Sequence, residues 1–140
     1  MKVFIDTTIP MYASGKQNRY KNPCREILAR IAEGSLDAAT DAEVFQEILY
    51  RYYYIQNMTL GKAIFREFRI VMNQVLSVSA EDIFYAEEIL DKYPKLKPRD
   101  ALHAAVMSHN GIGEVLTADR DFDQIPELTR IDPLDFLSQG

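Results

Sequence analysis

Short apolar runs alternate with longer helical patterns along these 140 residues, and this alternation constrains the fold more than any other feature. Alternating strands and helices are typical of an α/β protein built on a parallel sheet. Because no long linker or internal repeat interrupts the pattern, we expect residues 1–140 to form a single domain around a mainly parallel sheet of about five strands. The expected strands are residues 1–6, 35–40, 75–78, 114–117 and 128–131.

Capping residues predict where the helices begin and end. Asn22 followed by Pro23 is typical of a helix start and Gly34 of a helix stop, which predicts a helix over about 23–33. Thr40 and Glu43 have the spacing of a capping box for the next helix. The other expected helical features are a helix-opening turn at 7–10 and helices over 40–55, about 60–73, Ser79 to near Pro94, and 100–109.

Composition limits the classes of protein that fit. A hydrophobic content of 47% is enough for a core without disulfides, and the lone Cys24 predicts a buried thiol in a reducing compartment. No segment approaches the roughly 20 apolar residues that span a bilayer, and the start of the chain becomes acidic too early for a signal peptide. We therefore expect a soluble, cytoplasmic protein with no membrane contact.

The net charge of −5 argues against general binding of nucleic acid through a basic surface. The charge is unevenly distributed, because residues 1–70 carry ten Lys/Arg against eight Asp/Glu and residues 71–140 carry six against thirteen. A locally basic stretch contains Lys16, Arg19, Lys21 and Arg25. This stretch either contacts phosphates or is simply a solvated loop.

Four acidic residues are expected to meet at one edge of the sheet. Asp6 and Asp119 end strands, and Asp100 lies in the first turn of a helix that returns along the sheet. Ligands of open parallel sheets gather at this edge. Glu47 starts farthest from this edge, because it lies roughly 9 to 10 Å into its helix at 1.5 Å per residue. Its longer side chain must span part of that distance.

A cluster of carboxylates needs a compensating cation, since like charges confined in a cleft repel one another. Hard oxygen ligands without a cysteine pair or histidine cluster suit Mg²⁺ or Mn²⁺ better than zinc. The sequence therefore indicates metal-assisted hydrolysis of a phosphodiester.

Four motifs in the right order resemble those of the PIN-domain nucleases, including the VapC-type toxins: FIDTTIPMY, EVFQEIL, KPRDALHAA and VLTADRDF. The resemblance implies a three-layer α/β/α sandwich and a Mg²⁺- or Mn²⁺-dependent ribonuclease that cuts single-stranded RNA and leaves a 5′-phosphate. It also implies that the catalytic and metal-binding residues are Asp6, Glu47, Asp100 and Asp119. As a toxin, the chain would be silenced by a small antitoxin protein reaching into the acidic pocket.

Further residues are assigned around the four acids. The resemblance implies a polar residue beside the first acid, which Thr7 or Thr8 supplies. Adjacency to Asp100 and Asp119 makes three basic residues candidates for substrate binding: Lys97, Arg99 and Arg120. Three other acids lie close to these positions in the sequence. Glu43 is a reserve ligand, while Asp121 or Asp123 either assists at the site or caps a short helix.

Each acid also has a purely structural interpretation. Asp6 and Asp119 could be turn residues that bond local backbone, and Asp100 could favour the positive end of its helix. Glu47 could pair with Arg51 one turn later. We prefer ligation for all four because they coincide at one sheet edge.

The histidines and tyrosines are interpreted as structural. His103 is expected to be a hydrogen-bonded packing residue rather than a general base, and His109 suits the carboxyl end of its helix. A group of aromatic residues could stack on bases, but their helical spacing favours core packing or an interface. We predict that they form a clamp for a homodimer or a partner peptide: Tyr50, Tyr52, Tyr53, Tyr54, Phe65 and Phe68.

Other functional classes compete with the nuclease. A haloacid-dehalogenase-like phosphatase needs a second acid two residues after the first, where this chain has Thr8. A non-catalytic binding or scaffold domain with a residual pocket is an alternative, as is a stand-alone RNA-processing nuclease without an antitoxin.

Overall fold

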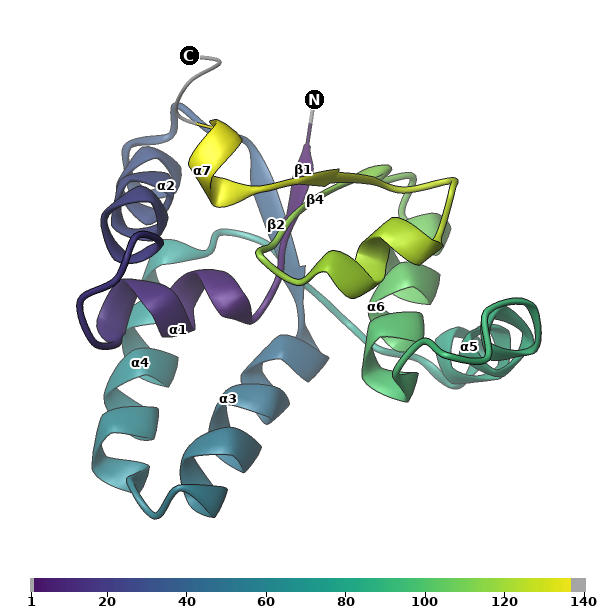
Figure 1. Ribbon diagram of the computed structural model, residues 1–140, viewed down its shortest axis with the longest axis horizontal. Coiled ribbons are helices and arrows are strands. Elements are labelled where there is room, and N and C mark those ends of the chain that lie inside the picture. Colours follow the sequence, from purple (N-terminus) through teal and green to yellow (C-terminus); the bar gives the residue numbers. More distant parts are fainter. Residues whose placement is uncertain (1, 137–140) are drawn as a thin grey trace.

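A parallel sheet of five strands forms the centre of the computed structural model, which describes residues 2–136 (Figure 1). The sheet order is β3-β2-β1-β4-β5, and every pair of neighbours is parallel. This arrangement confirms the predicted α/β fold class and its five strands. The strands are β1 Val3–Ile5, β2 Ala38–Asp41, β3 Val75–Leu76, β4 Glu114–Leu116 and β5 Thr129–Ile131.

Helices cover both faces of the sheet, so the three-layer sandwich is also confirmed. In Figure 1, α1 to α4 lie on one side of the strands, and α5 and α6 lie on the other. A 3₁₀ helix, η1, follows β4. The helices are α1 Thr8–Ser14, α2 Lys21–Glu33, α3 Ala42–Tyr54, α4 Met58–Val71, α5 Ala80–Lys92, α6 Pro98–His109, α7 Pro133–Phe136 and η1 Arg120–Gln124.

Two of the predicted helix starts are wrong. Asp41, not Thr40, caps α3 by accepting a hydrogen bond from the backbone N–H of Val44 at 3.0 Å. The Thr40 hydroxyl instead donates to the carbonyl oxygen of Ile5 at 2.8 Å, so Thr40 and Glu43 form no capping box. Helix α2 begins at Lys21, which places the expected cap residue Asn22 inside the helix.

Two other helix ends match the prediction. Gly34 ends α2 with a φ of 83°, a left-handed conformation that glycine adopts without steric cost. Ser79 and Asp82 form a complete capping box at the start of α5. The second helix of the opposite layer, α6, begins at Pro98 and places Asp100 in its first turn.

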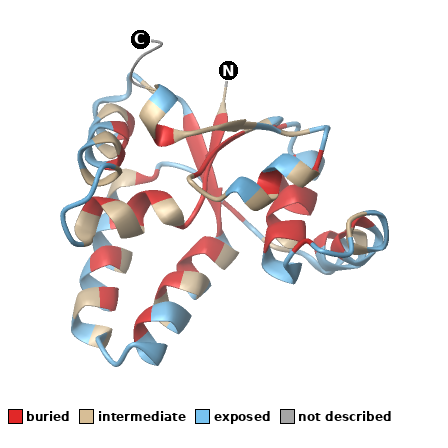
Figure 2. Ribbon diagram, in the orientation of Figure 1, coloured by how far each residue is buried: buried red, intermediate tan, exposed pale blue. Residues whose placement is uncertain are grey.

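The core lies where the strands contact the helices, as the burial colours in Figure 2 show. Strand β1 is buried along its whole length, and Phe4, Phe68 and Phe122 are among the largest fully buried side chains. Cys24 is buried as expected, and burial, with a smaller effect of the Asp132 charge, raises the pKa of its thiol to about 12.

The tyrosines of α3 do not act as one group. Tyr52 is buried against α4, whereas Tyr50, Tyr53 and Tyr54 are exposed. A Cβ added at Gly61 of α4 would lie only 2.5 Å from the Cβ of Tyr52, so this glycine allows the two helices to approach closely. Tyr52 and Phe68 belong to the core and not to an exposed clamp, which corrects part of that prediction. The homodimer stays a prediction.

No helix in residues 2–136 combines the length and apolar character needed to cross a bilayer.

Candidate active site

Asp6 occupies the central position of the site because it follows β1, the middle strand of the sheet. Its backbone N–H donates to the carbonyl oxygen of Leu116 on β4 at 3.2 Å. Its Oδ2 accepts a hydrogen bond from the Thr117 hydroxyl at 2.6 Å. Burial raises the pKa of the Asp6 carboxyl, while His103 and Thr117 oppose that rise. The carboxylate is thus held firmly at the carboxyl edge of the sheet.

Glu47 reaches the same place from α3. Its Oε2 accepts a hydrogen bond from the Thr7 hydroxyl at 2.8 Å and lies 3.9 Å from Nε of Arg99. Burial raises the pKa of Glu47, but hydrogen bonds from His103 and Thr7 outweigh burial, so the net pKa is lowered. The long side chain therefore spans the distance between the α3 backbone and the edge of the sheet.

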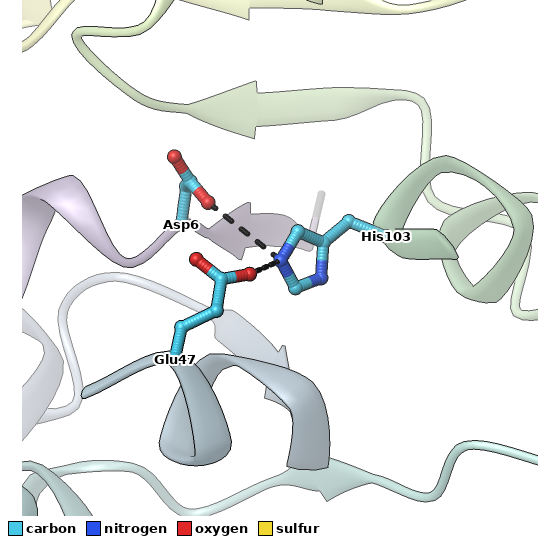
Figure 3. A group of neighbouring side chains, drawn as sticks. All are labelled: Asp6, Glu47 and His103. Carbon is cyan, nitrogen blue, oxygen red and sulfur yellow. Dashed lines mark hydrogen bonds and ion pairs between the residues drawn. The ribbon is translucent and has the colours of Figure 1, made fainter. Parts of the chain in front are cut away.

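His103 extends from α6 toward these two acids, as Figure 3 shows. Its Nε2 lies 2.5 Å from Oε1 of Glu47 and 4.0 Å from Oδ1 of Asp6, and its Nδ1 lies 2.7 Å from Oδ2 of Asp41. Burial opposes a charged imidazole, but the bonds to Asp41 and Glu47 prevail and raise the pKa of His103 well above its ordinary value. Residues Asp6, Glu47 and His103 are called the Asp6 half of the site.

Sequence reasoning missed Asp41 and underestimated His103. Asp41 is the last residue of β2, so the strand-end rule that selected Asp6 and Asp119 would also have selected Asp41. His103 lies three residues after Asp100 on α6 and therefore faces the same side. It is the hydrogen-bonded buried residue that was expected, but its partners belong to the site.

Three other carboxylates form the second part of the site, which we call the Asp100 half. Asp100, Asp119 and Asp121 each offer an oxygen, and these oxygens lie within 4.8 Å of one another. Burial first, and then the charges of Asp6 and Asp119, raise the pKa of Asp100 to about 7. Oδ2 of Asp100 is buried and has no hydrogen-bond partner in the described chain.

The two halves share one cavity of about 90 Å³, which all four predicted acids line together with Thr7 and Arg99. The cavity therefore presents several carboxylate oxygens, and Oδ2 of Asp100 has no protein donor to neutralise it. A divalent cation fits this donor set, because it accepts oxygen ligands and offsets their mutual repulsion.

The other predicted residues lie around this cavity. Nζ of Lys97 is 3.6 Å from Oδ2 of Asp121, and Arg99 lies beside Glu47. Arg120 is exposed at the start of η1 and does not line the acidic cavity. Asp123 bonds to Nε of Arg130 at 2.9 Å, which gives this acid a structural partner outside the cluster.

Glu43 and His109 also lie outside the acidic cavity. Glu43 lines a neighbouring cavity one turn before Glu47. His109 contacts Asp82 through Nδ1 at 2.5 Å and stacks on Tyr85, so it links α6 to α5.

Comparison with known proteins now identifies the family. The family model of the PIN domain matches residues 3–128. The chain belongs to the PIN domain family. Ribonuclease VapC13 of Mycobacterium tuberculosis and a VapC ribonuclease of Mycobacterium bovis are each 35% identical to this PIN domain over 129 residues, which cover 92% of this chain and 98% of each relative.

Solved structures share the fold of this PIN domain. VapBC2 from Rickettsia felis, solved with a DNA fragment from its promoter, superposes with a TM-score of 0.72 at 20% identity over 94% of this chain and 98% of that one. VapC20 of Mycobacterium tuberculosis, described as a toxin that cleaves the sarcin-ricin loop, gives a TM-score of 0.71 at 20% identity over 86% and 92%. At these identities the likeness concerns the fold.

Proposed function

We propose that this PIN domain is a metal-dependent endoribonuclease that hydrolyses phosphodiester bonds of single-stranded RNA. The observation that carries the proposal is the convergence of four acids from β1, α3, α6 and the end of β4 on one cavity in which a buried Asp100 oxygen lacks a partner. The names of the curated VapC relatives, which are ribonucleases, support the same activity.

The proposed roles follow from the contacts of each residue. Asp6, Glu47, Asp100 and Asp119 hold Mg²⁺ or Mn²⁺, which supplies positive charge where negative charge develops on the phosphate. Thr7 and His103 fix the orientation of Glu47 through their hydrogen bonds. His103 also places positive charge near Asp6, which opposes the rise that burial causes in the pKa of that carboxyl.

Basic residues at the entrance are assigned to the substrate. Lys97 and Arg99 have half-exposed side chains beside the acidic cavity, which allows them to contact the phosphates of a bound strand. Arg120 is exposed and follows Asp119 directly in the sequence. We assign it a weaker, longer-range contribution to the attraction of RNA.

We further propose that the protein is the toxin of a toxin-antitoxin pair. Solved VapBC complexes with the same fold support a small protein partner. We assign residues 1–140 to one domain that acts as a homodimer in the cytoplasm. The unpaired Cys24 agrees with a reducing compartment.

Cleavage of labelled single-stranded RNA in Mg²⁺, Mn²⁺ or EDTA tests the activity. We expect cleavage in either metal, no cleavage in EDTA, and products with a 5′-phosphate and a 3′-hydroxyl. The Asp6→Asn variant should be inactive. Equal cleavage in EDTA would refute the metal-dependent mechanism, and RNA binding without cleavage in any metal would favour the scaffold alternative.

A further inference from the structure

A second cavity of about 420 Å³ opens beside the acidic one, between α3 and the start of α6. It is called the Tyr50 cavity here, and its lining includes Gln46 and Tyr50 from α3 and Lys97 and Pro98 from the other side. Its size falls in the range of cavities that accept small ligands. Glu47 and Arg99 line both cavities, so a ligand in the Tyr50 cavity lies next to the acidic cluster. A strand cut at that cluster would extend into it.

One face of α3 builds the wall of this cavity. Glu43, Glu47, Tyr50 and Tyr54 are spaced three or four residues apart and therefore follow one side of the helix. Tyr50 is 52% exposed, and its ring packs on that of Tyr54 with centroids 4.7 Å apart. The ring is therefore supported by its neighbour but remains open to a ligand on the cavity side.

The opposite wall of the Tyr50 cavity carries two basic side chains that make only long ion pairs with neighbouring acids. The side chains of Lys97 and Arg99 are 55% and 45% exposed, and their contacts with Asp121 and Glu47 are long, at 3.6 and 3.9 Å. Lysine has three donors and arginine has five, so each retains donors for a phosphate. An aromatic platform beside free cationic donors is the combination that binds single-stranded nucleic acid.

We propose that the Tyr50 cavity binds the nucleotide adjacent to the scissile phosphate, with its base stacked on Tyr50 and its own phosphate held by Lys97 and Arg99. This inference rests on the proposed ribonuclease function and extends it to a substrate subsite. The anionic backbone of RNA satisfies both basic residues, which favours RNA over a basic peptide.

The polar lining predicts which bases are preferred. A carboxylate accepts hydrogen bonds but cannot donate them, and Glu43 presents one to the cavity. The amide of Gln46 both donates and accepts, and it has no side-chain hydrogen bond within residues 2–136. A base with an amino group, such as cytosine, therefore pairs better with this lining than uracil does.

Cleavage kinetics on a labelled single-stranded RNA test the subsite. Tyr50→Ala should raise KM about five- to tenfold with little change in kcat, because base stacking contributes to binding of the strand. Tyr50→Phe retains the ring and should behave as wild type. Tyr53→Ala is the matched control, because Tyr53 is 69% exposed on the same helix but does not line the cavity.

The outcomes separate the subsite from the activity. Absence of cleavage by the wild type would overturn the proposed function and the subsite together. Normal cleavage with an unchanged KM in Tyr50→Ala would overturn the subsite alone. A raised KM accompanied by a lower oligomeric mass in Tyr50→Ala would also overturn it, because Tyr50 would then act through an interface between copies.

Base preference is measured by comparing kcat/KM on oligocytidylate and oligouridylate. We expect the wild type to favour oligocytidylate and Glu43→Gln to reduce that ratio, because the amide replaces one acceptor oxygen by a donor. An equal rate on both substrates, or a ratio unchanged by Glu43→Gln, would overturn the assignment of base reading to Glu43.

Discussion

The two halves of the acidic site differ in how the protein treats their oxygens. In the Asp6 half, Thr7, Thr117 and His103 hydrogen-bond the carboxylates, and the imidazole provides positive charge. In the Asp100 half, Oδ2 of Asp100 is buried without a donor. The protein thus orients the acids of the Asp6 half and offsets part of their charge with its own side chains, whereas it leaves a buried oxygen of the Asp100 half without a donor.

Among the changes that distinguish the two halves, the largest expected effect comes from the Asp100 half. Asp100→Asn should reduce RNA cleavage at least about a hundredfold, because even changes to partners of metal ligands cost 10- to 100-fold in activity. Without added metal, the same variant should unfold at the same or a higher temperature, since repulsion from Asp6 and Asp119 is relieved.

Cleavage rates and thermal unfolding in EDTA measure these two effects. Asp91→Asn on α5 is the matched control, because Asp91 is exposed and lies outside the cluster. The control should change neither quantity. Near-normal cleavage by Asp100→Asn would contradict its assigned role.

In the Asp6 half, by contrast, a substitution is expected to lower the stability of the fold. His103→Ala should lower the free energy of unfolding by about 3 to 5 kcal/mol, because it leaves the buried Asp41 and Glu47 carboxylates without their charged partner. Urea unfolding measures the loss. His109→Ala is a control on the same helix with a 41% exposed side chain, and it should lose less. Equal losses of unfolding free energy in both variants would contradict the claim that His103 stabilises the buried Asp41 and Glu47 carboxylates.

The halves should also differ in their response to pH when a chelator is present. Folding raises the pKa of Asp100 from 3.8 to about 7, so the neutral carboxyl contributes stability below about pH 4 that is lost as the pH rises to about 7. The stability of Asp100→Asn relative to wild type should therefore increase across that window and then level off. Chemical unfolding of both proteins at several pH values measures this difference in unfolding free energy. A constant difference would contradict the raised pKa.

The smallest effect is expected where the two halves meet. The Thr117 hydroxyl donates to Asp6 at 2.6 Å and accepts from the backbone N–H of Asp119 at 3.0 Å. Thr117→Val should cost about 1 to 2 kcal/mol of unfolding free energy, since the hydrogen bonds to Asp6 and Asp119, and a further one to the Thr8 hydroxyl at 3.2 Å, are lost in a buried position. Thr129→Val, on the exposed side of β5, is the control. Equal unfolding free energies in the two variants would show that the hydrogen bonds of the Thr117 hydroxyl do not stabilise the fold.

The sequence alone predicted the acids that follow strands and the general fold. Asp6 and Asp119 were predictable because the carboxyl ends of parallel strands share one edge. Asp41 satisfies the same rule but was missed, because the spacing of Thr40 and Glu43 suggested a different cap. In the structure, Oδ1 of Asp41 caps α3 and Oδ2 of Asp41 bonds to His103. A local capping pattern does not predict the second of these contacts.

Contacts between distant elements could not be predicted from periodicity. Helical spacing placed Tyr50 and Tyr52 in one aromatic group, but only the position of α4 determines that Tyr52 is buried and Tyr50 is exposed. The two partners of His103, Asp41 and Glu47, likewise depend on how β2, α3 and α6 are placed at the edge of the sheet. Such information arises from tertiary packing, which a single sequence does not encode in its local pattern.

Titration with Mn²⁺ followed by calorimetry tests the central claim most directly, because it measures cation binding apart from cleavage. The wild type should bind Mn²⁺, and Asp6→Asn and Asp100→Asn should each weaken binding at least about tenfold, while Asp91→Asn binds normally. Binding by Asp6→Asn and Asp100→Asn that is as tight as in the wild type would contradict the claim that the two halves hold a cation.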